Sequence, residues 1–228
     1  FPVLSKLWVD QGNELSQTFQ QSIKYILIAA VPMAIFFFAF SEPIISLFYG
    51  LDEYAPSVGV LKIFAPGIIL VYVDFILGST ILATDKQKRW AIIGFAAVLL
   101  NIVLNYFLIP YTQNRFGNGG FGAASTTLIT EIFIMIAALA LLPRQYFKGY
   151  KISLPLKTIF AGIILASLVV LMNMVNLFWV IQAVVGGGIY LTLIIMFKIM
   201  TRAELEFFRE FFTLKKLKGF IYRKRQHV

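Results

Sequence analysis

The chain has 228 residues, of which 59% are hydrophobic and only 14% charged, and its mean hydropathy is +0.82. A soluble domain of this length would need many more charges on its surface, so lipid is the expected solvent. The absence of cysteine excludes disulfides and thiolate chemistry, and the single histidine, His227, lies in a basic tail. The net charge of +9 does not predict a nucleic-acid partner, because the basic residues flank apolar segments.

The chain starts at Phe1, inside an apolar segment and without a signal peptide pattern. We therefore expect a fragment of a longer polypeptide. Residues 1–22 are predicted to be the end of a preceding helix and a cytoplasmic lead-in, with a polar helix over 14–21.

Six segments are long and apolar enough to cross a bilayer as helices, which takes about 20 residues each. They run approximately over 23–40, 59–83, 89–109, 120–142, 156–175 and 177–199. Between the first two, Pro43 interrupts the apolar run, and a short outer helix is expected over 44–49, ending at Gly50. The predicted fold class is all-α, with a six-helix transmembrane domain over 23–200.

The charges of the connections alternate along the chain, which tests the six spans independently. Basic residues precede the first span and fill every second connection: Lys6, Lys24, Lys86, Lys88, Arg89, Arg144, Lys148 and Lys151. The other connections carry Glu42, Asp52 and Glu53, then Arg115 alone, then no charge. Because lysine and arginine are enriched in cytoplasmic loops, we predict a multi-pass protein of the plasma membrane with both ends of this chain in the cytoplasm.

The last predicted segment, 201–228, has apolar residues near one helical face and basic residues among them. This pattern is typical of a cytoplasmic amphipathic helix that lies on the inner leaflet. Such a helix either binds anionic lipid or a partner, or is a simple anchor.

Two acidic residues, Asp74 and Glu131, lie in the middle of the second and fourth spans. At about 1.5 Å per residue both are expected near the bilayer centre and level with each other. A charged carboxylate there costs roughly 2.5–3.5 kcal/mol on insertion scales, so it usually faces a bundle interior and often serves in ion or proton coupling. The alternative is that each is protonated and hydrogen-bonded to a neighbouring helix.

Four other polar residues in the spans are candidates for the same cavity. Lys62, near the outer end of the second span, either extends its ammonium back to water or faces an outward cavity where it meets a phosphate. Asn101 and Asn105 share one face of the third span, and Thr127 stands four residues before Glu131. They are expected to line the cavity or to form hydrogen bonds between helices.

Residues 117–122 match the G-x-G-x-x-G pattern of dinucleotide-binding sites. That site requires a preceding strand in a βαβ unit, whereas this copy follows an apolar span. We interpret it as a tight turn followed by close helix packing through Gly122, Ala123 and Ala124. Residues 186–188, inside the last span, are likewise interpreted as a packing or bending site.

No metal-ligand, nucleophile or phosphate-loop pattern occurs in the chain. We therefore predict that the protein is not an enzyme and has no metal or other cofactor, apart from coupling to H⁺ or Na⁺.

Several short motifs, in this order, resemble the multidrug/oligosaccharidyl-lipid/polysaccharide (MOP) exporter superfamily, and its polysaccharide-type flippase branch in particular. They are Phe1-Pro2-Val3-Leu4-Ser5-Lys6-Leu7, Val31-Pro32, the run over 44–50, Ile81-Leu82-Ala83, the run over 100–110, and the G-x-x-G-A-A-x-T-T pattern from Gly119 to Thr127. The resemblance covers about residues 1–142. The last two spans and the tail resemble the family only in their general type of segment and contain none of these motifs.

The resemblance implies a two-lobed, MATE-like transporter that works by alternating access, in which these six helices form part of the C-terminal lobe. The implied substrate is a lipid-linked oligosaccharide or polysaccharide precursor, and the implied partners are the bilayer and an N-terminal lobe of the same polypeptide. The family's basic substrate-binding residues lie largely in that other lobe, and these spans hold no arginine cluster.

Rival hypotheses are a cation-coupled multidrug exporter or a lipid II flippase of the same fold. From other classes, the rivals are a membrane-bound enzyme of glycan assembly and a non-transporting scaffold. The enzyme would need a large outer loop with catalytic groups, but the longest one offers only Glu42, Asp52 and Glu53.

Overall fold

The computed structural model describes residues 14–201 and 204–206, and these residues form helices joined by short turns. The elements are α2 (Glu14–Ala39), α3 (Ser41–Tyr49), α4 (Leu51–Phe64), α5 (Gly67–Ala83), α6 (Gln87–Phe116), α7 (Gly120–Leu141), the 3₁₀ turn η1 (Arg144–Phe147), α8 (Ser153–Met174) and α9 (Trp179–Met196). The described part contains no strand, so the predicted all-α class is confirmed for it.

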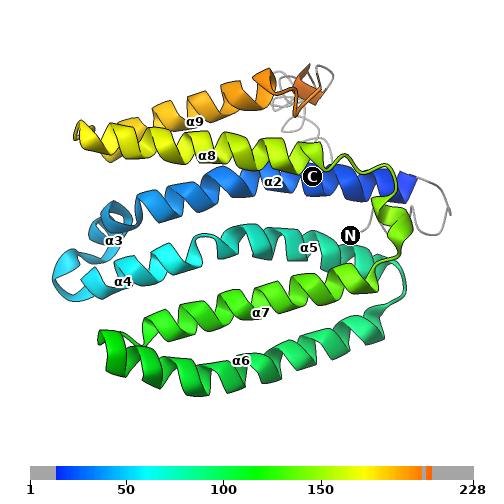
Figure 1. Cartoon of the computed structure of the whole chain (residues 1–228), viewed down its shortest axis with the longest axis horizontal. Coiled ribbons are helices and arrows are strands. Elements are labelled where there is room, and N and C mark those ends of the chain that lie inside the picture. Colours follow the sequence, from blue (N-terminus) through cyan, green and yellow to red (C-terminus); the bar gives the residue numbers. More distant parts are fainter. Residues whose placement is uncertain (1–13, 202–203, 207–228) are drawn as a thin grey trace, which may run out of the picture.

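The long helices lie side by side in a row, in the order α6, α7, α4 with α5, α2, α8 and α9 (Figure 1). Helix α2 is at the centre of this row. Its first half packs with α5, α7 and η1 around Phe19 and Leu77. Its second half packs with α8 and α9 around Val31 and Leu165. Helix α2 therefore joins a four-helix group to the α8–α9 hairpin.

Among the residues that the structure describes, five helices are long and apolar enough to cross a membrane, and a sixth crossing exists if α4 and α5 count as one span. The predicted span 59–83 is thus two helices, bent by 47° at a short break. Pro66 and Gly67 lie at this break, where proline cannot donate the backbone hydrogen bond that would continue α4. Helix α2 also differs from its prediction, because the lead-in helix and the first span form one continuous helix.

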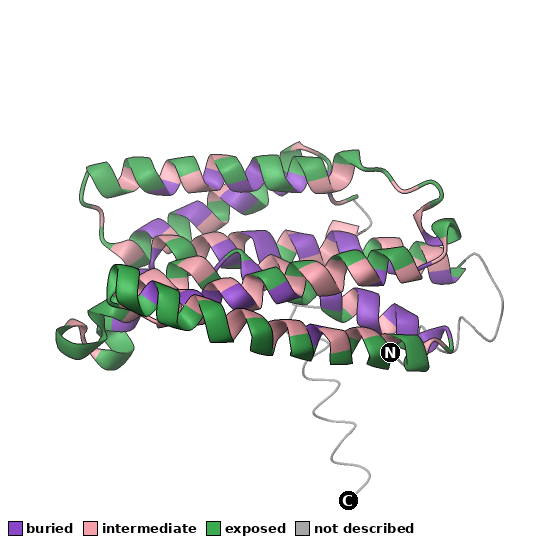
Figure 2. Ribbon diagram, turned by 60° about the horizontal axis from the view of Figure 1, so that its bottom comes forward, coloured by how far each residue is buried: buried purple, intermediate pink, exposed green. Residues whose placement is uncertain are grey.

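Much of the row's outer surface is exposed (Figure 2), and many large apolar side chains of the described residues are among those exposed. Helix α6 is the least buried of the five long apolar helices of the described residues, with Ala97 and Thr112 as its only buried residues. An apolar helix with so little of its surface packed against protein is stable only in a lipid solvent, because water would meet an uninterrupted apolar face. The structure thus agrees with the membrane class indicated by the composition.

The glycine-rich turn after α6 has the packing role predicted for it. Gly117 ends α6 with a left-handed backbone conformation, φ 69°, which glycine adopts without steric cost. A Cβ atom on Gly122 would lie 2.4 Å from the carbonyl oxygen of Leu108. The backbones of α6 and α7 therefore approach each other so closely at this point that only glycine fits. Of the second glycine run, Gly186 packs against Leu165, whereas Gly187 and Gly188 face open space.

Pro32 inside α2 leaves one backbone carbonyl without its usual partner, and α9 supplies a replacement. Proline has no N–H, so the carbonyl of Ile28, four residues earlier, loses its helical hydrogen bond. The hydroxyl of Tyr190 on α9 donates to that carbonyl at 3.0 Å. The Tyr190 side chain is almost fully buried. A tyrosine from a helix far along the chain thus compensates for the proline and fixes how α9 sits on α2.

This compensation predicts a non-additive pair of substitutions. Tyr190→Phe is expected to lower the free energy of unfolding by about 1 kcal/mol, because the Ile28 carbonyl loses its donor inside an apolar bundle. In a Pro32→Ala background the alanine N–H restores the helical bond, so the same Tyr190→Phe change is expected to cost less. A double-mutant cycle measured by reversible unfolding in mixed micelles tests this. Equal costs of Tyr190→Phe in both backgrounds would contradict it.

Apart from Arg115 in the last turn of α6, the basic residues of the turns gather at one end of the row. The turn between α5 and α6, the segment from η1 to α8 and the start of α2 lie at one end, and α3 and the turns before α7 and α9 lie at the other (Figure 1). Two lysines at the basic end bond to the ends of helices: Lys86 donates to the carbonyl of Leu141 at 2.9 Å, and Lys157 to that of Phe197 at 3.1 Å. Cations are favoured there because helix C-termini expose unpaired carbonyls and a partial negative charge.

A reciprocal cap begins the segment after α9. The backbone N–H of Thr201 donates to Glu204, and the N–H of Glu204 donates to the hydroxyl of Thr201, which is the capping-box arrangement of a helix start. The same carboxylate forms an ion pair with Lys24 of α2 and accepts a hydrogen bond from Tyr25. The remainder of the amphipathic helix and basic tail predicted over 201–228 lies almost entirely outside the described residues.

The ion pair between Lys24 and Glu204 predicts a loss of stability in acid. Burial raises the pKa of Glu204, but hydrogen bonds from Lys24, Tyr25 and Thr201 outweigh it and lower the pKa to about 2. Because the folded state lowers the pKa of this carboxyl group, the ionised group stabilises the fold above the ordinary pKa near 4.5. This stabilisation is lost as the pH falls toward 2. Unfolding temperatures of the parent protein and Glu204→Gln should therefore differ at pH 6 and converge on acidification. A constant difference across this range would contradict the assignment.

Candidate functional site

The two acidic residues predicted to lie at one level are neighbours in the structure. Asp74 lies near the middle of α5 and is buried, with 7% of its surface exposed. Glu131 lies near the middle of α7 and is half-buried. The packing of α5 against α7 places the carboxyl group of Glu131 within hydrogen-bonding reach of Asp74. Two carboxyl groups therefore meet in the interior of an apolar bundle.

Asp74 has no N–H or hydroxyl donor to either carboxyl oxygen in the part of the chain that the structure describes. Two ionised carboxylates cannot bond to each other and repel strongly at this separation, and burial adds a further cost for each charge. A single proton between them removes one charge and creates a hydrogen bond across the α5–α7 contact. The pair is chemically suited to bind a proton or a small cation.

Asn101 and Asn105 form a hydrogen-bonded ladder between α6 and α7. The amide of Asn105 donates to the side-chain oxygen of Asn101 at 2.8 Å, and the amide of Asn101 donates to the hydroxyl of Thr130 at 3.2 Å. Thr130 in turn donates to the carbonyl of Thr126. Two buried oxygens of this cluster, Oδ1 of Asn105 and Oγ1 of Thr126, have no partner among the described residues.

Thr127 takes no part in that ladder. Its hydroxyl donates to the carbonyl of Ala123 in its own helix at 3.0 Å, a local bond that is common for threonine in apolar helices. The structure thus places Asp74 with Glu131, and Asn101 with Asn105 and Thr130, on different contacts of α7.

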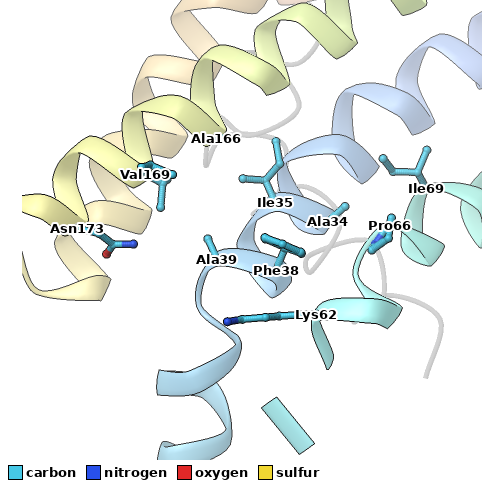
Figure 3. A pocket seen from close by; sticks show the side chains of 11 residues that line it. Ala34, Ile35, Phe38, Ala39, Lys62, Pro66, Ile69, Ala166, Val169 and Asn173 are labelled. Atoms are coloured by element: carbon cyan, nitrogen blue, oxygen red, sulfur yellow. The ribbon is translucent and has the colours of Figure 1, made fainter. Parts of the chain in front are cut away.

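Lys62 lies in the last turn of α4, next to the break between α4 and α5. It projects from α4 into a groove of about 500 Å³ between α2, α4 with α5, and α8 (Figure 3). The other polar residue that lines this groove is Asn173, near the end of α8. Apart from these two, the lining side chains are apolar.

The sequence analysis did not identify two candidate residues of this region, Asn173 and Gln182. Asn173 is an ordinary polar residue at the end of a span, and neither hydropathy nor a motif distinguishes it from any loop residue. Gln182 is almost fully buried and sits in the first turns of an otherwise apolar span. A buried amide in such a position usually bonds to a neighbouring helix, so its place in the sequence was a usable signal.

A comparison with family models finds that residues 10–107 match the MatE family, a family of membrane transporters. The matched region runs from before α2 into α6 and includes Asp74, Lys62, Asn101 and Asn105. It covers less than half of the chain and excludes Glu131 and the whole of α8 and α9. No curated protein and no solved structure matches the chain.

Proposed function

We propose that this chain is part of a membrane transporter of the MOP superfamily, which moves lipid-linked oligosaccharide or polysaccharide precursors across the plasma membrane by alternating access. The MatE match over 10–107 and the row of long apolar helices support the transporter class. The order of the short motifs from Phe1 to Thr127 supports the polysaccharide branch. The basic turns at one end of the row support an orientation with that end in the cytoplasm.

The observation that carries the mechanism is the contact between Asp74 and Glu131. With one shared proton, a hydrogen bond joins α5 to α7. Without it, two like charges repel, and at a generic separation of about 4 Å and an effective dielectric constant near 20 such a repulsion amounts to about 4 kcal/mol. A difference of that size changes the ratio of two conformations by roughly a thousandfold, about a tenth of the roughly ten-thousandfold change that a complete switch requires. Loss of the proton thus favours a state in which α5 and α7 are separated.

The break between α4 and α5 allows such a movement. Pro66 and Gly67 interrupt the backbone hydrogen bonds of the bent pair about two helical turns before Asp74, so α5 can change its tilt without unwinding either helix. A proton taken up on one side and released on the other would then drive the exchange of the two states. A sodium ion would take the place of the proton in this scheme, with Asp74 and Glu131 as the residues that hold it.

The identity of the substrate is tested by a transport assay with the full-length protein in proteoliposomes. The probe is a fluorescent polyprenyl-pyrophosphate oligosaccharide, and its arrival in the opposite leaflet is followed by an impermeant quencher or a sugar-specific lectin. We expect translocation that depends on the imposed pH or sodium gradient. Gradient-driven transport of ethidium with no movement of the lipid-linked sugar would instead identify a multidrug exporter. Movement of neither probe would contradict the proposed transport.

A further inference from the structure

The groove that contains Lys62 is a candidate binding site distinct from the carboxyl pair. Its floor is α2, with Ala34, Ile35 and Phe38. One wall is formed where α4 meets α5, at Pro66 and Ile69, and the other wall is formed by α8 (Figure 3). Its volume of about 500 Å³ lies in the range of small-molecule sites, which are mostly apolar and carry a few polar groups that orient the ligand.

The hydrogen bonds around Gln182 determine how the Asn173 amide is oriented. The carbonyl of Leu177 can only accept, and it receives a hydrogen bond from Nε2 of Gln182 at 2.7 Å. The same nitrogen donates to the side chain of Asn173 at 2.8 Å, so the Asn173 atom that faces it is the oxygen. The NH₂ group of Asn173 must therefore point away from Gln182. Figure 3 shows this nitrogen directed into the groove.

Lys62 supplies a second donor to the same space. Its side chain extends from α4 across the groove, and its nitrogen and the amide nitrogen of Asn173 point toward each other (Figure 3). Within residues 14–201 and 204–206 the ammonium forms no ion pair with an acid, and no acidic residue lines the groove. Two donors that face each other, one of them a cation, are complementary to an anion placed between them.

We propose that this groove binds a glycerophospholipid with an anionic headgroup, whose phosphate accepts hydrogen bonds from Lys62 and Asn173 while an acyl chain lies along the apolar walls. A free anion would leave those walls uncovered, whereas a lipid satisfies both parts of the groove. A zwitterionic headgroup fits less well, because the groove offers no carboxylate to its ammonium group. This site is independent of the transport cycle built on Asp74 and Glu131.

These 228 residues contain no cysteine, so after replacement of any cysteine elsewhere in the full-length protein, a cysteine introduced here is unique. Ala166→Cys places a bimane fluorophore on the wall of the groove, and Val98→Cys places it on the exposed face of α6 as the control. The full-length labelled protein is reconstituted with brominated phosphatidylglycerol or brominated phosphatidylcholine, which quench on contact. At position 166 we expect quenching to show that phosphatidylglycerol binds about fivefold more strongly than phosphatidylcholine. At position 98 the two lipids should quench equally.

Substitutions of Lys62 complete the test. Lys62→Gln is expected to remove the preference at position 166, and Lys62→Arg to retain it. Equal quenching by both lipids at position 166, or a preference that survives Lys62→Gln, would overturn the proposal. So would the absence of quenching at position 166 alone, because protein would then fill the groove. Millimolar inorganic phosphate should not reduce the preference, and if it does, the bound species is a free anion.

Discussion

Replacing Asp74 with asparagine or Glu131 with glutamine is expected to reduce gradient-driven transport roughly tenfold or more, because each change removes the charge repulsion that separates α5 from α7. The expected loss concerns coupling only. Exchange of substrate between the leaflets without a gradient should be retained, since it needs no proton cycle. The measurement is initial translocation rate in proteoliposomes with and without an imposed pH gradient.

The two carboxyl groups should also behave as one unit. If they share a proton, the double variant Asp74→Asn with Glu131→Gln is expected to be no worse than either single variant, rather than showing the product of two losses. Asp52→Asn is the matched control, because Asp52 is an exposed acid at the start of α4. Full gradient-driven transport by the double variant would contradict the coupling role while leaving the transporter class intact.

Gly122→Ala is expected to lower the free energy of unfolding by about 1–3 kcal/mol, the usual cost of overpacking a tight contact. The added methyl group would lie 2.4 Å from the carbonyl oxygen and 2.5 Å from the carbonyl carbon of Leu108. Backbone atoms cannot rotate away as a side chain can, so α6 and α7 must separate. Their separation would also strain the ladder between Asn101 and Thr130.

Gly94→Ala is the control for that experiment. Gly94 lies in the interior of α6, and a Cβ atom there would meet nothing within 4 Å. Because alanine favours helix by about 1 kcal/mol over glycine, this variant should be neutral or slightly more stable. Unfolding in mixed micelles compares the two, and equal stability of both variants would contradict the close approach of α6 and α7.

The apolar runs were sufficient to predict the helices, because a segment in lipid must satisfy its backbone internally whatever its neighbours are. Hydropathy does not detect a bend. The span predicted over 59–83 is two helices because Pro66 interrupts it, and α4 begins earlier, at Leu51, before the apolar run. Helix α6 also continues past Pro110 to Phe116. There the Thr112 hydroxyl bonds to the carbonyls of Leu108 and Ile109 in its own helix and accepts a hydrogen bond from the N–H of Gly122, so this last part of α6 is joined to α7.

The candidate site was only partly accessible from the sequence. The equal depth of Asp74 and Glu131 follows from counting residues along two spans, and the glycine pattern pointed to a close contact. Counting residues along the chain does not show which helices are neighbours in space. The bond from Tyr190 to the Ile28 carbonyl joins residues 162 positions apart, and the groove between Lys62 and Asn173 depends on α2 separating α4 from α8. Both arise from the order of helices in the row.

The central claim is that the row of helices crosses a membrane with its basic turns on the cytoplasmic side. These 228 residues contain no cysteine, so single cysteines introduced here can report this in intact cells once any cysteine elsewhere in the full-length protein is replaced. We expect a membrane-impermeant thiol reagent to label Asp52→Cys and Arg115→Cys from outside, and to label Lys88→Cys and Lys151→Cys only after the membrane is made permeable. Labelling of position 88 or 151 in intact cells would contradict the orientation, and labelling of all four positions without permeabilisation would contradict the membrane embedding itself.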